Sequence, residues 1–495
     1  MALGQPPWGL WPLALAGMAV ALWLIATAPD PRAGFLRGWL AGAAGFALAM
    51  VWIVEPFLVE PERHGWMAPF ALVLLPGGLA LFWGLAGAFA VWAARGAGAR
   101  LALGAVALTG AEGLRGWLFT GLPWAQAGHI WIDTPVLQLA ALGGAYGLSA
   151  LALGVAAAMA GGWLLWHAGR RAPALGTAVA AGLVLGMGWG WGLARLAEAP
   201  PDDQPLRLRL VQPNATQPLK WDPDYAELFF YRHLDLSAAP AEDGRAPDLV
   251  IWSETAVPFF LENPGNALEV AAQVIGAGRL ILGVQRSEIG GDGVRRFFNS
   301  LAVLDGDGAP THLYDKHHLV PFGEYAPVLG QFSDRFGGLA AQVLAGYSAG
   351  PGPMLLDLEP VLPGAGRVLP LICYEAIFPR NLRGTERPDW LLQVTNDAWF
   401  GARIGPFQHL AQARLRAVEQ GLPLARAANT GVSAMIDARG QVVASLGLDR
   451  AGIVDANLPG ALPPTPYARG GDWPWYLALT LVLGLAAGQR WRNRH

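Results

Sequence analysis

The fold is decided by one short stretch, VLPLICYE (residues 368–375), an apolar, strand-like run that ends on the only cysteine of the chain and a following Tyr-Glu pair. A single cysteine can form neither an intrachain disulfide nor a CxxC metal site. Two interpretations of Cys373 remain. It is a small buried hydrophobic side chain, as most lone cysteines are, or it is a nucleophile at the end of a strand, where reactive groups lie in α/β folds.

The composition indicates a membrane protein that also carries a soluble domain. Of the 495 residues, 53% are hydrophobic and only 14% are charged, whereas an ordinary soluble domain is about 25% charged. The formal net charge of -3 is small, and it does not suggest binding to nucleic acid. The length leaves room for a set of membrane helices and one full soluble domain.

Apolar runs gather at the two ends of the chain. Most of them reach the roughly 18–20 residues that a membrane-spanning helix needs. Six runs precede residue 200 and a seventh follows the soluble part: Trp11–Ala28, Phe35–Val54, Pro69–Ala94, Leu101–Trp117, Pro135–Trp166, Ala172–Leu196 and Trp475–Gly488. We therefore predict a transmembrane helical domain of about six spans over residues 1–199, a soluble domain over 205–460 and a C-terminal transmembrane helix over 473–490.

Arginine residues mark alternate loops between these runs and the C-terminal tail: Arg32, Arg37, Arg95, Arg100, Arg170, Arg171, Arg490, Arg492 and Arg494. Positively charged loops remain in the cytoplasm. The soluble domain then lies on the opposite side, which is the periplasm if this is a bacterial inner-membrane protein.

One predicted span carries two charges, Glu112 and Arg115, which are costly in lipid. They form a pair at the membrane interface, or they help to shape a lipid-facing cavity next to the soluble domain. Their spacing does not separate these alternatives.

Strand-like and helical patterns alternate between residues 205 and 460, which indicates an α/β domain with a mixed sheet. The expected strands are 206–211, 248–252, 279–285, 299–304, 368–372, 390–394, 432–437 and 442–444, and the expected helices are 225–236, 267–277 and 406–420. The turn Asp305-Gly306-Asp307-Gly308 has the composition of a hairpin.

Polar groups follow several of these strands: Glu254, Lys316 with Glu324, Cys373 and Asn396-Asp397. Each has an ordinary structural explanation. Glu254 could cap the next segment, Lys316 could be a solvated surface lysine paired with Glu324, and Asn396-Asp397 could make a turn.

Together these residues fit acyl transfer through a thioester. A carboxylate can remove the thiol proton and later return it, and a fixed lysine can stabilise the oxyanion. A lysine between two carboxylates stays charged. We expect His317 and His318 to be less suitable bases than Glu254.

The order Trp252-Ser253-Glu254, Lys316 and Cys373-Tyr374-Glu375 resembles the Glu-Lys-Cys triad of the carbon–nitrogen hydrolase (nitrilase) superfamily. Longer motifs resemble the apolipoprotein N-acyltransferase family over nearly the whole chain. They are 212–214 with 220–221, 316–324, 372–375, 396–401, 114–117 with 120–124, and 465–469 with 472–474.

The resemblance implies a four-layer α-β-β-α sandwich, the nitrilase-like fold, on a polytopic α-helical membrane domain. It implies that a phospholipid, typically phosphatidylethanolamine, donates its sn-1 acyl chain to the cysteine, and that the thioester acylates the N-terminal diacylglyceryl-cysteine of an apolipoprotein. We expect a monomer that needs no metal or cofactor.

The resemblance also assigns roles to individual residues. Glu254 is the base, Lys316 stabilises the oxyanion and Cys373 is the nucleophile. The supporting residues are Glu324, Tyr374 and Glu375, and the lipid-contacting aromatic residues are Trp221 and Trp399.

Two departures from the family pattern stand out. Position 253 is serine where the family usually has proline, which puts little in doubt. The family typically has an even number of spans and we predict seven, so we expect a further helix upstream of Met1. The rival interpretations are a membrane-tethered nitrilase-type amidase, whose acceptor is water, and a receptor or transporter subunit that only binds lipid or lipoprotein.

Overall fold

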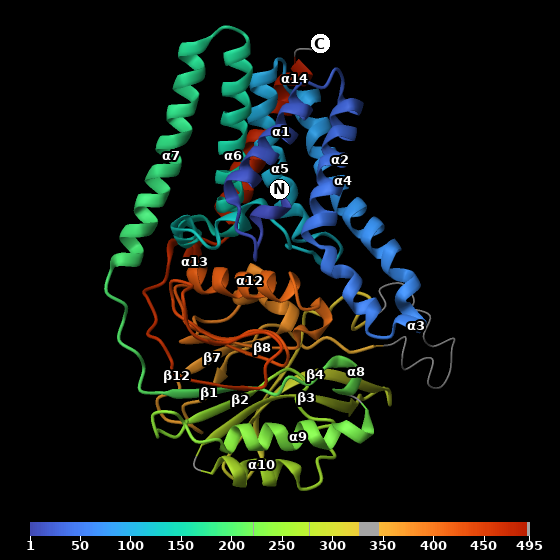
Figure 1. Cartoon of the computed structure of the whole chain (residues 1–495), viewed down its shortest axis with the longest axis vertical. Coiled ribbons are helices and arrows are strands. Elements are labelled where there is room, and N and C mark those ends of the chain that lie inside the picture. The colour runs from blue at the N-terminus through green and yellow to red at the C-terminus, as the bar shows by residue number, and fades with distance from the viewer. Residues whose placement is uncertain (221, 277, 326–345, 493–495) are drawn as a thin grey trace.

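The computed structural model describes residues 1–220, 222–276, 278–325 and 346–492, and it has two parts (Figure 1). One is a set of long helices, and the other is an α/β domain below them in the view of Figure 1. The helical part contains α1 (Trp11–Ala26), α2 (Pro31–Ala49), α3 (Pro61–His64), α4 (Ala68–Ala93), α5 (Ala97–Arg115), α6 (Ala140–His167), α7 (Arg171–Ala197) and α14 (Trp473–Arg492). Each of the seven predicted apolar runs thus contains a long helix.

Not all of these helices are long and apolar enough to cross a bilayer on their own. Among the described residues three stretches are, namely Pro61–Ala93, Pro135–His167 and Arg171–Ala197. Pro31–Ala49 makes a fourth if it is counted with Val51–Leu58, from which it is bent by 49°. Seven helices stand where seven spans are predicted, and three or four of them meet this criterion in the described residues, so the count of seven spans stays a prediction.

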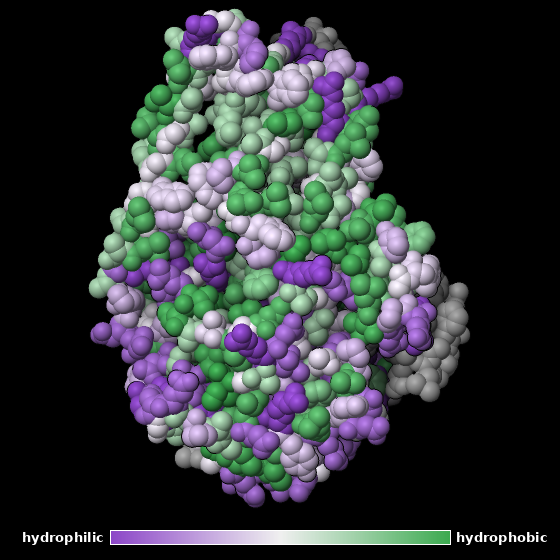
Figure 2. Space-filling view, viewed as in Figure 1, coloured by the Kyte–Doolittle hydropathy of each residue, from purple (hydrophilic) through white to green (hydrophobic). Residues whose placement is uncertain are grey.

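Helices α2 and α4 pack closely because glycines leave room for the backbone. A Cβ atom on Gly38 would lie 2.6 Å from the carbonyl oxygen of Trp83, and one on Gly87 would lie 2.5 Å from the carbonyl oxygen of Gly34. Small residues at such contacts let membrane helices approach to van der Waals distance. Hydrophilic side chains gather at the far tip of the helices and over the α/β domain, with apolar side chains along the helices between them (Figure 2).

Both charged residues of α5, Glu112 and Arg115, are buried. Arg115 Nη1 donates to the carbonyls of Leu122 and Trp124, the latter at 2.7 Å, and Glu112 Oε1 accepts from the Ala127 N–H at 2.8 Å. The pair therefore holds the chain that follows α5 against the helix end.

The α/β domain contains two six-stranded sheets, in the orders β12-β1-β2-β3-β4-β5 and β11-β10-β9-β8-β7-β6. The strands are β1 (Arg207–Gln212), β2 (Leu249–Trp252), β3 (Arg279–Ile289), β4 (Arg295–Leu304), β5 (Pro310–Asp315), β6 (Leu356–Asp357), β7 (Arg367–Ile372), β8 (Trp390–Thr395), β9 (Leu424–Ala428), β10 (Ser433–Ile436), β11 (Val442–Leu446) and β12 (Gly452–Asn457). Both sheets mix parallel and antiparallel pairs, as predicted: β1-β2-β3 and β7-β8-β9 are parallel, and β4 and β5 are antiparallel and joined at the turn for which the composition indicated a hairpin. Strands β5, β6, β9 and β12 were not predicted.

Helices cover the outer faces of the two sheets, so the domain has four layers (Figure 1). Helix α9 (Pro223–Ala238) and helix α10 (Ala267–Ile275) lie on the first sheet, and α12 (Gly405–Gln420) lies between the second sheet and the membrane helices. The short helices α8 (Gln217–Lys220) and α13 (Pro466–Gly470) complete the domain. This is the predicted α-β-β-α arrangement.

Helix α12 also connects the domain to the helical part. Gln408 Oε1 accepts from the indole N–H groups of Trp52 at 3.1 Å and Trp124 at 2.6 Å. Glu419 Oε1 accepts from the Ala145 N–H at 2.9 Å, where α6 is interrupted at Gly144 (φ 61°). The second sheet is therefore held close to the membrane helices.

Candidate active site

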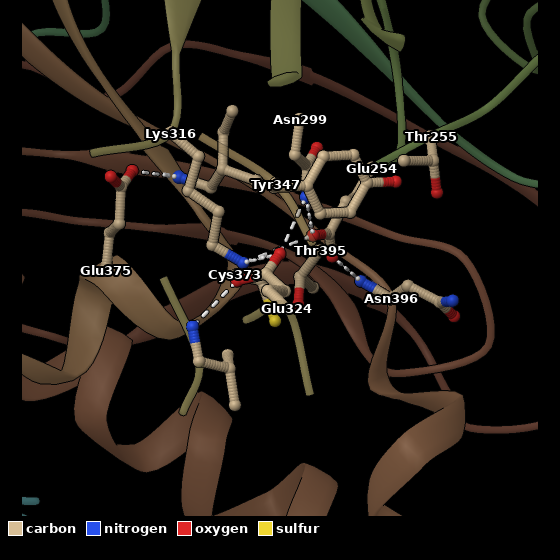
Figure 3. Close-up of polar contacts among 12 residues, drawn as sticks. Glu254, Thr255, Asn299, Lys316, Glu324, Tyr347, Cys373, Glu375, Thr395 and Asn396 are labelled. Carbon is tan, nitrogen blue, oxygen red and sulfur yellow. Dashed lines mark hydrogen bonds and ion pairs between the residues drawn. The ribbon is translucent and has the colours of Figure 1, made fainter. Parts of the chain in front are cut away.

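Cys373 lies immediately after β7, at a sharp turn into a short 3-10 helix, Cys373–Ile377. Its φ is +50°, a left-handed conformation that costs a non-glycine residue energy and that persists where the surroundings enforce it. The Cys373 carbonyl accepts from Gln393 Nε2 at 3.1 Å and lies 3.1 Å from His409 Nε2. These two buried side chains hold the strained turn from behind, and the thiol faces Glu254 and Lys316 (Figure 3).

Glu254 follows β2, in the other sheet. Its Oε1 accepts from Asn299 Nδ2 at 2.7 Å and its Oε2 accepts from the Asn396 N–H at 2.8 Å. Behind it, Lys220 Nζ donates to the Glu254 carbonyl at 3.0 Å and to Thr255 Oγ1 at 2.8 Å. Contacts from both sheets therefore fix the position of this carboxylate.

Lys316 follows β5 and lies between two carboxylates (Figure 3). Its Nζ is 2.8 Å from Glu324 Oε1 and 3.5 Å from Glu254 Oε1, and only 1% of the side chain is exposed. Burial alone would lower the pKa of Lys316, but Glu324 and Glu254 together raise that pKa above its ordinary value. Lys316 therefore remains an ammonium ion that can stabilise negative charge.

The Cys373 thiol is protonated at rest. Burial raises its pKa, the Glu254 carboxylate raises it further, and the opposing effect of Lys316 is smaller, so the pKa lies above the ordinary value. A thiol in this environment needs a base at the moment of attack, because the thiolate is the nucleophile.

Glu375 is buried and connects the cysteine turn to the segment that carries Lys316. Its Oε1 accepts from the N–H groups of His317 at 2.8 Å and His318 at 3.1 Å, and its Oε2 accepts from the Ile372 N–H and the Tyr314 hydroxyl at 2.8 and 2.9 Å. Burial would raise the pKa of Glu375, but the contact with His317 and the N–H donors lower it. This carboxylate therefore aligns the two segments.

The rings of the two histidines next to Lys316 contact residues other than Cys373. His317 Nδ1 lies 2.8 Å from Glu375 Oε1. The His318 ring stacks on Phe378 at 3.7 Å between centroids, and burial followed by the charge of Arg380 lowers its pKa to about 4. This geometry supports Glu254 as the base.

The predicted aromatic residues differ in their placement. Tyr374 is buried, and its hydroxyl donates to the carbonyl of Gly121 in the helical part at 3.0 Å. Trp399 is 40% exposed and lies in the short 3-10 helix Asp397–Phe400, beside the same seam between the two parts. Trp221 lies outside the described residues.

Several residues of the site were not predicted. Asn299 contacts both Glu254 and Glu324. The Tyr347 hydroxyl contacts Gln285 and accompanies the carboxylates in Figure 3, and burial raises its pKa to about 12. The available signal for Asn299 was a polar residue at the head of the predicted strand 299–304, although the structure places it in the middle of β4, whereas Tyr347 stands in a loop without a pattern.

Comparisons with known proteins agree with this architecture. Residues 1–158 match the model of the apolipoprotein N-acyltransferase N-terminal domain, and residues 207–463 match the carbon-nitrogen hydrolase model. An apolipoprotein N-acyltransferase of Rhizobium meliloti is 41% identical over 93% of this chain and 88% of its own length. One of Caulobacter vibrioides is 40% identical over 99% and 92%.

Among solved structures, an amidase from Nesterenkonia sp. aligns with 57% of this chain and 99% of its own, at 19% identity and a TM-score of 0.38.

Proposed function

The chain belongs to the apolipoprotein N-acyltransferase family, and from that membership we propose how its residues carry out the acyl transfer. The protein is an acyltransferase of lipoprotein maturation. We propose that the acyl donor is a membrane phospholipid of the phosphatidylethanolamine type, that Cys373 carries the acyl chain as a thioester, and that the acceptor is the N-terminal amine of a diacylglyceryl-cysteine.

In the first step Glu254 takes the thiol proton as Cys373 Sγ attacks the carbonyl carbon of the sn-1 ester. The negative charge that develops on the ester oxygen is stabilised by the Lys316 ammonium. The intermediate then collapses: the bond to the glycerol oxygen breaks, Glu254 gives that oxygen its proton, and a lysophospholipid leaves. Glu324 keeps Lys316 charged and in place throughout.

In the second step the free amine of the acceptor attacks the thioester carbonyl. Glu254 removes a proton from the amine, an amide bond forms, and the Cys373 thiolate leaves and regains its proton from Glu254. Tyr374 and Glu375 shape the site, and Trp399 and Trp221 contact lipid at its mouth.

The observation that carries this proposal is the place of Cys373. The thiol lies on a strained turn beside a carboxylate and a lysine, and the next residue, Tyr374, donates to the membrane part at Gly121. An enzyme whose two substrates are both held in the bilayer needs its active site at the contact between the α/β domain and the membrane helices.

The same arrangement supports the proposed topology. We propose a monomer in the bacterial inner membrane, with the α/β domain over 205–460 in the periplasm and residues 1–199 and 473–490 in the membrane. Arg170 and Arg171 connect α6 and α7 at the end of the helices away from the α/β domain (Figure 1), where the positive-inside rule places the cytoplasm.

The decisive experiment is to incubate the purified protein with a phospholipid labelled in its sn-1 chain. We expect a hydroxylamine-sensitive acyl adduct on Cys373, none on Cys373→Ala, and transfer of the label to a diacylated lipopeptide with a free amine but not to its N-acetylated form. A wild-type protein that binds the donor without forming the adduct would remove the mechanism. Release of free fatty acid in place of transfer would favour an amidase-like hydrolase.

A further inference from the structure

After α5 the chain forms a loop, residues 116–122, which contains the short 3-10 helix Leu118–Thr120 and which we call the collar loop. Phe119, Thr120 and Gly121 have φ values of 55°, 74° and 91°. Left-handed conformations at two consecutive non-glycine residues are strained, and such strain gathers where the surroundings impose a functional geometry. Phe119 at the tip is 92% exposed and Trp117 is 51% exposed, which is typical of a segment that faces lipid or its interface.

The collar loop lies directly on the active-site side of the α/β domain. The Tyr374 hydroxyl donates to the Gly121 carbonyl at 3.0 Å, and His318 Nε2 lies 3.1 Å from the Thr120 carbonyl. Trp117 Nε1 donates to the Tyr476 hydroxyl of α14 at 2.6 Å. The loop therefore separates lipid from the residue that follows the nucleophile.

Arg380, in the short 3-10 helix Pro379–Leu382, completes this edge of the site. Its guanidinium donates to the carbonyls of Gly116, at 3.3 Å, and Thr120. It lies over the ring of Trp117 at 4.6 Å and over that of Phe378 at 5.0 Å, measured to the ring centroids. Cation–π contacts hold a guanidinium in place without neutralising it.

The charge of Arg380 has no carboxylate partner among the described residues, since none of the ion pairs there includes it. Two carbonyls and a 3.5 Å contact with His318 Nε2 occupy at most three of the five N–H donors of a guanidinium. Arg380 is half-buried at a lipid-facing edge. Its positive charge and its remaining N–H donors are therefore available to bind an anion.

We propose that Arg380 binds the phosphate of the phospholipid acyl donor and so places the sn-1 ester at Cys373. The inference rests on the proposed function, because it requires that the donor be a phospholipid. A planar guanidinium pairs with a phosphate through two parallel hydrogen bonds. The phosphate and the sn-1 ester are attached to the same glycerol. Because Arg380 lies one short helix beyond Cys373, a phosphate bound by its guanidinium also orients the ester. Because Arg380 recognises the phosphate and not the head group, phospholipids with different head groups can serve as donors.

Arg380 also has a structural role, because it holds the collar loop through Thr120. A test must separate the two roles, and the choice of donor does so. Loss of loop anchoring affects every acyl donor, whereas loss of phosphate binding affects only donors that carry a phosphate.

The experiment measures the rate of adduct formation on Cys373 in phospholipid-free detergent. The donors are phosphatidylethanolamine and the p-nitrophenyl ester of the same fatty acid, which has no phosphate. For Arg380→Gln we expect labelling from the phospholipid to fall about 10- to 100-fold and labelling from the p-nitrophenyl ester to stay within about twofold. Arg380→Lys keeps the charge but not the paired geometry, and we expect an intermediate rate.

The matched control is Arg387→Gln. Arg387 also donates only to carbonyls in the described structure, but to those of Gln420, Gly421 and Leu462. It should leave both rates unchanged. An equal fall for both donors in Arg380→Gln, or no fall for either, would overturn the phosphate site. A wild-type protein labelled by neither donor would overturn the proposed function and this inference with it, whereas wild-type labelling supports the thioester whatever Arg380 does.

Discussion

Two buried groups of charges lie on opposite sides of the second sheet, and they differ in how completely their polar atoms are paired. Around Cys373, both oxygens of Glu254 and both oxygens of Glu324 accept hydrogen bonds, and Lys316 lies between them. On α12, Arg416 Nη2 pairs with Glu419 Oε1 at 2.9 Å, but Glu419 Oε2 and Arg416 Nε have no partner in the described structure.

The difference separates a site built for chemistry from a contact between domains. The carboxylates of the Cys373 cluster are paired at both oxygens, although Asn299 Oδ1 beside them has no partner in the described structure. The base and the lysine are therefore already in place when substrate arrives. A buried ion pair with unpaired atoms carries a desolvation cost that its attraction offsets only in part. The Arg416–Glu419 pair therefore positions α12 under α6 at the expense of stability.

The largest expected effect comes from removing the base of the paired cluster. In Glu254→Gln the side chain keeps its shape but cannot take the thiol proton, and the raised pKa of Cys373 leaves almost no thiolate at neutral pH. We expect the rate of adduct formation to fall about 1000-fold, measured with labelled phospholipid. Glu324→Gln keeps the base and should lose only about tenfold. Equal losses in the two variants would contradict the assignment of Glu254 as the base.

A smaller effect is expected from the half-paired ion pair, and it depends on pH. Burial raises the pKa of Glu419 from 4.5 to about 7 in the folded protein. The folded state then binds this proton more tightly than the unfolded state, so the contribution of Glu419 to stability is highest below pH 4.5 and falls as the pH rises to about 7. The full loss is about 3 kcal/mol.

Glu419→Gln should remove this dependence and melt at a higher temperature than wild type at pH 8, measured by thermal unfolding in detergent. Glu198→Gln is the control, because the Glu198 carboxylate is mostly exposed. A wild-type melting temperature that does not fall between pH 5 and 8 relative to Glu419→Gln would contradict the raised pKa.

The smallest effect belongs to an ion pair at the rim of the same contact. Arg414 Nη1 lies 2.6 Å from Asp133 Oδ1, and 49% of the aspartate side chain is exposed. Because solvent screens the two charges, such a pair contributes less than about 1 kcal/mol to the free energy of unfolding. Arg414→Gln should therefore shift the melting temperature only slightly and leave adduct formation unchanged. A shift in melting temperature as large in size as that expected for Glu419→Gln at pH 8 would show that the rim carries the contact.

The sequence predicted well where a local pattern carries the information. Alternating and apolar runs located β1, β2, β7 and β8, and the residues directly after them, Glu254 and Cys373, meet with Lys316. Serine at position 253 is buried, and the turn after Glu254 is held by Lys220, so the substitution for proline leaves this strand end intact.

The sequence predicted poorly where the information is non-local. Leu424–Ala428 forms β9 because it pairs with β8 and β10, not because of its own alternation. The contact between Tyr374 and Gly121 spans 253 positions, and no spacing reports it. The spacing of Glu112 and Arg115 left two interpretations open because their partners are backbone groups, which carry no signature in the side-chain pattern.

The pairing of β1 with β12 sets the order in which the enzyme can be made. Arg207 lies opposite Asn457 in that antiparallel pair, with both cysteine and base between them in the chain. The first sheet therefore keeps β1 as an open edge until residue 457 has been synthesised, and closing so long a loop is slow compared with local folding. A chain interrupted after Cys373 would hold its nucleophile beside an unfinished sheet, so the domain becomes complete only when synthesis is about to reach the last helix, α14.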